Sequence, residues 1–159
     1  MILVADASAL IALATCDGLP WLDALFGEVL VPEAVYREVT LADKPQAMRL
    51  HAYLQGKIRQ VDMADFVYLD AYADAGETQA MVLYKSAGAD YLLIDDKKGR
   101  KVAQINRIKT IGSVGVLIQA KKAGLITHVK PSIDLIIASQ IYMSTELINA
   151  VLAMADEHY

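Results

Sequence analysis

Short apolar runs alternate with amphipathic stretches along the chain, and this pattern predicts an α/β protein. Runs rich in Val, Ile and Leu predict strands at Met1–Ala5, Val29–Val31, Tyr91–Ile94 and Thr110–Ile111, with a minor strand or extended connection at Ile58–Val61. Apolar residues at helical spacing predict helices from Ala7 to the break at Asp17, at Trp21–Phe26, at Glu33–Val39, from the turn at Lys44 and Pro45 to Leu54, at Asp65–Ala73, at Glu77–Ala87, at Lys97–Asn106, from the turn at Gly112 through Ala123, at Pro131–Ile141 and at Ser144–Met154. Strands separated by helices indicate a layered α/β fold with a parallel sheet.

The length of the chain, 159 residues, fits one domain with a full hydrophobic core. No internal repeat, low-complexity tract or linker interrupts it. We expect residues 1–130 to form the main domain and residues 131–159 to form a C-terminal helical extension of it. The apolar residues of this extension recur at spacings of three and four, so one face of each helix must be covered. Either the same chain or a second chain could cover it.

Composition narrows the class of protein. The longest apolar burst near the start, Ala9–Ala14, is far shorter than the ~20 residues that cross a membrane. No basic region precedes the first apolar run, which argues against a secretory signal. The single cysteine, Cys16, excludes an intramolecular disulfide and a cysteine metal cluster, and we expect it to be a small buried residue. A cytoplasmic protein is the default expectation.

Charge is distributed unevenly along the chain. The net charge is −4, yet the segment from Lys97 to Lys130 carries nine basic residues and no acidic one. This basic run is either a solvated helical surface or a surface that binds a phosphate backbone. The second interpretation gains weight if carboxylates able to hold a metal ion lie beside the run.

Acidic residues stand where strands end and where helices begin. Asp6 follows the first predicted strand, and Asp95 and Asp96 follow the third; Glu38 lies on the helix after the second strand, and Glu77 lies at the start of another helix. A structural role could explain each acid separately. Asp6 could cap a helix, Asp95 and Asp96 could be turn residues, Glu38 could face water, and Glu77 could be a favourable acid in the first turn of a helix. Ligands in open parallel sheets bind beyond the carboxyl ends of the strands, so together these acids predict a site for Mg²⁺ or Mn²⁺.

The ordered set of these segments resembles the PIN-domain family. The opening Val4-Ala5-Asp6-Ala7-Ser8 is similar to its first motif, Val31-Pro32 with Glu38 to its second, and Gly76-Glu77 with Ala80 to its third. The run Leu92–Ala103 is similar to the fourth motif, and Ile111–Leu117 to the segment after it. The combination, from about Ile2 to Pro131, resembles the VapC-like subfamily known as DUF3368.

The resemblance implies a three-layer α/β/α sandwich around a central parallel sheet and cleavage of single-stranded RNA with Mg²⁺ or Mn²⁺. It also implies a homodimer and an antitoxin protein as partner, as in a type II toxin–antitoxin pair. Carried over to this sequence, the catalytic acids are Asp6, Glu38, Glu77, Asp95 and Asp96, and the metal ligands are Asp6, Glu77 and Asp96. Ser8 and Ser113 would support these acids, and Lys97, Lys98, Arg100 and Lys101 would bind RNA. Asp95 and Asp96 point to opposite faces of an extended strand, which leaves open which of the two contacts the metal.

The residues leave two other functions to consider. An aspartyl-phosphate phosphohydrolase acting through Asp6 would want a second acid two residues later, where this chain has Ser8. A PIN-fold module that binds RNA or protein without cleaving is the other alternative. No acidic position of the family pattern is lost, so nothing in the sequence favours it.

Overall fold

A parallel sheet forms the centre of the computed structural model, which describes residues 1–64 and 73–158. Its strands stand in the order β3-β2-β1-β4-β5. They are β1 (Ile2–Ala5), β2 (Glu28–Pro32), β3 (Ile58–Arg59), β4 (Tyr91–Leu93) and β5 (Thr110–Ile111). Every pairing among them is parallel, and Val4 of the central strand pairs with Leu30 on one side and Leu92 on the other. The predicted parallel α/β fold is therefore confirmed.

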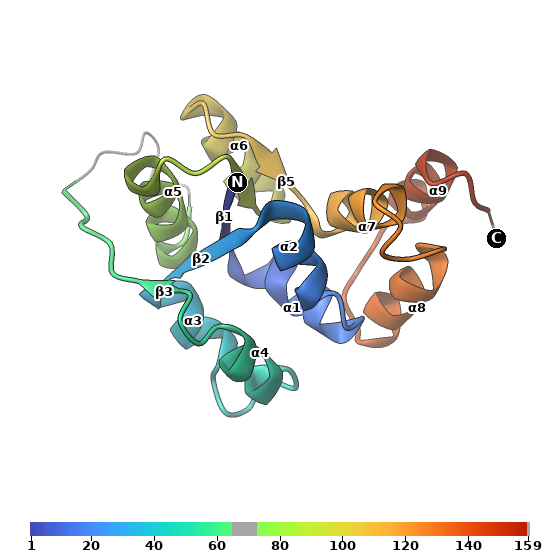
Figure 1. Ribbon diagram of the computed structural model, residues 1–159, viewed down its shortest axis with the longest axis horizontal. Helices are drawn as coiled ribbons and strands as arrows, with labels where there is room; N and C mark the ends of the chain where they lie inside the picture. Colours follow the sequence, from blue (N-terminus) through green and yellow to red (C-terminus); the bar gives the residue numbers. More distant parts are fainter. Residues whose placement is uncertain (65–72, 159) are drawn as a thin grey trace.

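Helices cover both faces of the sheet (Figure 1). Leu3 and Ala5 point into a core shared with α1 (Ala7–Thr15), α2 (Leu19–Phe26) and α7 (Ser113–Lys122), whereas Val4 points into a core shared with α5 (Ala75–Ala87) and α6 (Lys97–Ile105). The side-chain alternation of a strand thus produces the three layers. Two further helices, α3 (Glu33–Val39) and α4 (Ala47–Tyr53), lie near the β3 edge.

The C-terminal helices pack on the chain's own core. They are α8 (Lys130–Ala138) and α9 (Thr145–Met154), and they lie beside α7 at one end of the molecule in Figure 1. Ile133 and Leu152, at most 1% exposed, belong to the same core cluster as Leu3. The buried side chain of Glu157 links the end of the chain to α7 and to the start of α8. Its carboxylate accepts hydrogen bonds from the backbone N–H of Val129 at 2.9 Å and from the Lys121 ammonium at 3.0 Å. The same chain therefore covers the inner face of the tail.

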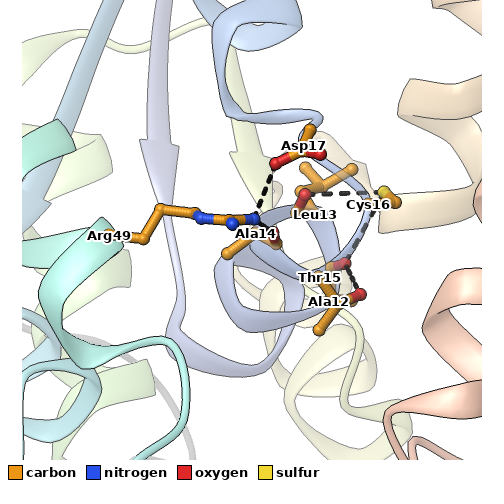
Figure 2. A network of polar contacts seen from close by, with 7 residues as sticks. All are labelled: Ala12, Leu13, Ala14, Thr15, Cys16, Asp17 and Arg49. Carbon is orange, nitrogen blue, oxygen red and sulfur yellow. Dashed lines mark hydrogen bonds and ion pairs between the residues drawn. The ribbon is translucent and has the colours of Figure 1, made fainter.

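A small polar network joins α4 to the end of α1 (Figure 2). The Arg49 guanidinium donates to the Ala14 carbonyl oxygen and pairs with the Asp17 carboxylate at 2.7 Å. It thereby adds a second donor to a carbonyl oxygen at the end of α1 that otherwise accepts only a long hydrogen bond, 3.4 Å, from the Asp17 N–H. Cys16, 5% exposed, donates to the carbonyl oxygens of Ala12 and Leu13 and is the buried residue expected from the sequence.

Element boundaries differ from the sequence prediction where local chemistry intervenes. Helix α8 ends at Ala138 instead of Ile141, since Gln140 adopts a left-handed φ of 64° that a helix cannot continue through. Helix α5 begins at Ala75 instead of Glu77, because the Asp74 side chain caps it. The helix predicted at Asp65–Ala73 falls on residues 65–72, which lie outside the described residues.

Across residues 1–64 and 73–158, no single helix is long and apolar enough to cross a membrane. Only α1 and α2 taken together reach such a length, and they are bent by 113° relative to each other.

Packing of α8 on the core can be tested with two isoleucines of that helix. Ile133 is fully buried and Ile137 is 38% exposed. We expect Ile133→Ala to lower the free energy of unfolding by about 2–5 kcal/mol, as deletion of buried methylenes does. Ile137→Ala makes the same chemical change at an exposed position and should cost clearly less. Urea unfolding followed by circular dichroism measures both, and equal losses would contradict the packing described.

Candidate functional site

Carboxylates meet at the carboxyl ends of the two central strands. Asp6 directly follows β1, and Asp95 and Asp96 follow β4 after one intervening residue. These strands are adjacent and parallel, with Ala5 paired to Leu93, and the Asp6 N–H donates to the Leu93 carbonyl oxygen at 2.8 Å. The sheet order changes direction between these strands, where open α/β sheets form their ligand crevice.

Two helices supply the remaining acids. Glu38 comes from the last turn of α3, which β2 places beside the sheet edge, and Glu77 comes from the first turn of α5. All five acids predicted from the sequence line one open cleft of about 330 Å³, together with Ala7, Ser8 and Asp74. The structure thus brings together residues that lie as far apart in the chain as Asp6 and Asp96.

Asp74 is a sixth acid of this cleft that the sequence prediction missed. Its Oδ1 accepts a hydrogen bond from the Glu77 N–H at 2.7 Å and caps α5. A Cβ placed on Gly76 would stand 3.3 Å from Glu38 Oε2 and 3.5 Å from Asp74 Oδ1, so Asp74 also lies close to the acid from α3. The sequence signal that could have revealed it is an Asp three residues before Glu77, a spacing typical of a helix start.

Asp6 and Glu77 are buried acids with unsatisfied oxygens. They are 4% and 6% exposed, and neither Asp6 Oδ1 nor Glu77 Oε2 has a hydrogen-bond partner among the described residues. Asp6 stands at the N-cap position of α1 but its side chain makes no capping hydrogen bond, which disfavours the structural explanation of this residue. A buried polar atom without a partner is costly, so these two oxygens indicate a place for a ligand.

The electrostatics of the cleft disfavour its own negative charge. Burial, and to a smaller extent the neighbouring carboxylates of Asp74, Glu38 and Asp96, raise the pKa of Asp6 from 3.8 to about 7. Burial, followed by the hydrogen bond and charge of Asp74, raises the pKa of Glu77 from 4.5 to about 8. Burial and the charge of Asp74 also raise the pKa of Glu38. A cation in the cleft would reverse these effects, because it favours the ionised form of each acid.

Asp95 and Asp96 are held differently. Asp95 uses both oxygens on Ser113, accepting from its N–H at 2.7 Å and from its hydroxyl at 2.8 Å. Among the described residues, Asp96 accepts through Oδ2 alone, from the Gly99 N–H at 2.7 Å, and so caps α6. Ser113 therefore holds Asp95 from the start of α7, whereas one oxygen of Asp96 has no hydrogen bond among the described residues.

The predicted RNA-binding residues lie at the start of the helix that Asp96 of the cleft caps. Lys97, Lys98, Arg100 and Lys101 are all exposed, and they occupy the first turns of the helix that follows Asp96. None of the four forms an ion pair within the described part of the chain. Two lysines at the start of a helix are unfavourable for its dipole, which makes a bound anion more favourable there.

The donor chemistry of the cleft suits a hard divalent cation. Most of the side-chain donors that line it are carboxylate oxygens, the ligands of Mg²⁺ and Mn²⁺, and two of these oxygens are buried without a partner among the described residues. Within residues 1–64 and 73–158, no three His, Cys, Asp or Glu side chains stand together closely enough to hold one ion between them. Mg²⁺ does not require this, since it is commonly bound through one or two carboxylates and several waters. One or two of the ligands predicted from the sequence, Asp6, Glu77 and Asp96, would be enough to hold it together with waters.

Comparison with known proteins gives one family. The family model described as DUF3368, a PIN domain, matches residues 2–157, which includes α8 and α9 as well as the sheet. The match extends well past Pro131, where the resemblance read from the sequence ended. A search of curated proteins finds no match.

The raised pKa values of Asp6 and Glu77 generate a prediction on stability. An acid whose folded-state pKa is raised favours folding most below its unfolded-state pKa, and this contribution is lost as pH rises through the folded-state value. In chelator, we expect the free energy of unfolding to fall between about pH 4 and pH 8, and Asp6→Asn to remove part of that fall. The part removed should be on the order of a few kcal/mol, because each pKa unit is worth about 1.4 kcal/mol.

Chemical denaturation at several pH values measures this dependence. Asp43→Asn changes an exposed acid outside the cleft and is the matched control. An Asp6→Asn variant with the same pH dependence as the wild type, or one less stable at pH 8, would give Asp6 a structural role instead.

Proposed function

The chain belongs to the PIN-domain family DUF3368, and from that membership and its carboxylate cleft we propose that it is a metal-dependent endoribonuclease that cleaves single-stranded RNA. Proteins of this family are generally nucleases and typically depend on divalent metals. The observation that carries the proposal is the pair of buried oxygens on Asp6 and Glu77 that have no partner among the described residues, inside a cleft that six acids line together with Ser8 and Ala7.

In the proposed reaction the side chains of the cleft have different tasks. Asp6, Glu77 and Asp96 would hold Mg²⁺ or Mn²⁺, which when bound activates water and stabilises the leaving oxygen of a phosphodiester. Asp95 joins the end of β4 to the start of α7 through Ser113 and so fixes the position of Asp96 beside it. Glu38 is exposed at the cleft with a raised pKa, so its carboxylate can exchange a proton with solvent water.

The substrate proposal depends on the basic face of α6. The acids of the cleft repel a polyanion, and Lys97, Lys98, Arg100 and Lys101 provide the opposite charge next to it. Ser8 lines the cleft at the exposed start of α1, where its hydroxyl can bind a phosphate oxygen or a water.

We extend the proposal to the biological role that the VapC-like family pattern implies. The protein would be the toxin of a type II toxin–antitoxin pair, a homodimer inhibited by a cognate antitoxin protein. Large apolar side chains remain exposed on the C-terminal helices and the loop between them, with Tyr142 at 88% and Met154 at 66%. Exposed apolar residues of this size favour contact with another chain.

Cleavage of RNA by the purified protein tests the catalytic proposal. We expect it to degrade a labelled single-stranded RNA with Mn²⁺ or Mg²⁺ and to stop in chelator. Asp6→Asn, Glu77→Gln and Asp96→Asn should each lower the rate by roughly a hundredfold or more, because each removes a charged ligand of the site. Asp43→Asn should cleave at the wild-type rate. Activity that survives both chelator and Asp6→Asn would rule out this mechanism.

Salt dependence tests the basic face. In an Asp6→Asn background, which prevents cleavage, replacing Lys97, Lys98, Arg100 and Lys101 by glutamine should weaken RNA binding. The slope of log K against log salt should fall by about 0.7 for each side chain that contacts a phosphate of a single strand. Lys122→Gln, at an exposed lysine of α7 outside the cleft, should leave the slope unchanged. If the variant with all four substitutions keeps the slope of its Asp6→Asn parent, these residues are solvated surface and do not bind RNA.

A further inference from the structure

A glycine lies where the two helices that carry Glu77 and Asp96 approach each other. Gly99 is the third residue of α6, and it is buried. Its φ does not lie in the left-handed region, so the backbone does not require glycine here. Alanine at this position would favour the helix, since glycine has the lower helix propensity. Something other than local conformation must therefore account for a glycine.

The space around Gly99 supplies the reason. A Cβ at this residue would overlap with Glu77 Oε2, and it would stand 3.0 Å from Glu77 Cδ and 2.7 Å from Ile94 Cδ1. The Glu77 carboxyl group thus lies directly against the backbone of α6. The oxygen in contact is the one that is buried without a hydrogen-bond partner.

The same glycine also holds the other acid. Its N–H donates to Asp96 Oδ2 at 2.7 Å, so the backbone of one residue contacts carboxylates that come from α5 and from the end of β4. We propose that Gly99 is a positioning residue of the metal site, whose missing side chain lets Glu77 come within reach of the ion that Asp96 also binds. This inference rests on the proposed function, because it assigns a residue that determines the metal affinity of that same cleft.

The chain offers a matched control in Gly115. It is likewise the third residue of its helix, α7, and a Cβ there would meet only the Ile111 side chain, at 2.9 Å from Cγ1. Replacing either glycine by alanine gives the same gain in helix propensity. Only the change at position 99 disturbs a carboxylate.

Calorimetric titration of the full chain with Mn²⁺ alone tests the proposal without relying on activity. Ile94→Val removes the Cδ1 atom, so the pair Gly99→Ala with Ile94→Val isolates the contact with Glu77. We expect this pair to bind Mn²⁺ about tenfold more weakly or worse than Ile94→Val alone, the scale of loss seen when a residue supporting a ligand is changed. Gly115→Ala should bind Mn²⁺ like the wild type.

Stability in chelator separates positioning from folding. If the pair of substitutions at 99 and 94 does not fold, adding Glu77→Ala should restore folding, because it removes the clash; failure to restore it overturns the proposal. Mn²⁺ affinity within about twofold of the Ile94→Val protein also overturns it. A wild-type protein that binds no Mn²⁺ would instead contradict the metal site itself and the proposed function with it.

Discussion

Negative charge held inside a poorly solvated cleft is the constraint on which the rest of this structure depends. Six carboxyl groups of the described residues line one cleft, and the two most buried, Asp6 and Glu77, each have one oxygen without a hydrogen-bond partner among those residues. Burial removes these acids from water, and the neighbouring carboxylates add repulsion, so the pKa values of Asp6 and Glu77 rise in the absence of a cation. The fold must supply enough stability elsewhere to hold these groups together.

The fold holds these acids in position mainly through backbone hydrogen bonds and less through side chains. The two central strands pair through Leu93 and Asp6, and the acids are then fixed by N–H groups: Asp74 by Glu77, Asp95 by Ser113 and Asp96 by Gly99. Backbone donors are neutral, and they hold a carboxylate in place without adding a counter-charge that would compete with a metal ion. The basic side chains stay outside the cleft, on the exposed part of α6.

The sequence predicted those parts of the structure where the type of a residue at its position has a single physical explanation. Apolar runs ending in acids predicted the parallel sheet and the convergence of Asp6, Glu38, Glu77, Asp95 and Asp96, because the carboxyl ends of parallel strands share an edge. It did not reveal Asp74, since an acid in a stretch of uncertain structure looks like surface until α5 is seen to begin there. It also could not place the C-terminal helices, because an amphipathic pattern shows that a face is covered and says nothing of what covers it.

The strand order also determines when the site comes into existence as the chain folds. On one side β1 pairs with β2, and only α1 and α2 lie between these strands along the chain. On the other side it pairs with β4, which lies almost ninety residues further along the chain, as the pairing of Leu3 with Tyr91 shows. Contacts between such distant segments form late, because closing a long loop costs entropy before any pairing compensates for it. Asp6 and Asp96 meet only after that closure, so a partly folded chain has no assembled cleft. Assembly of the cleft should thus accompany completion of the tertiary fold, because its acids come from segments on both sides of that closure.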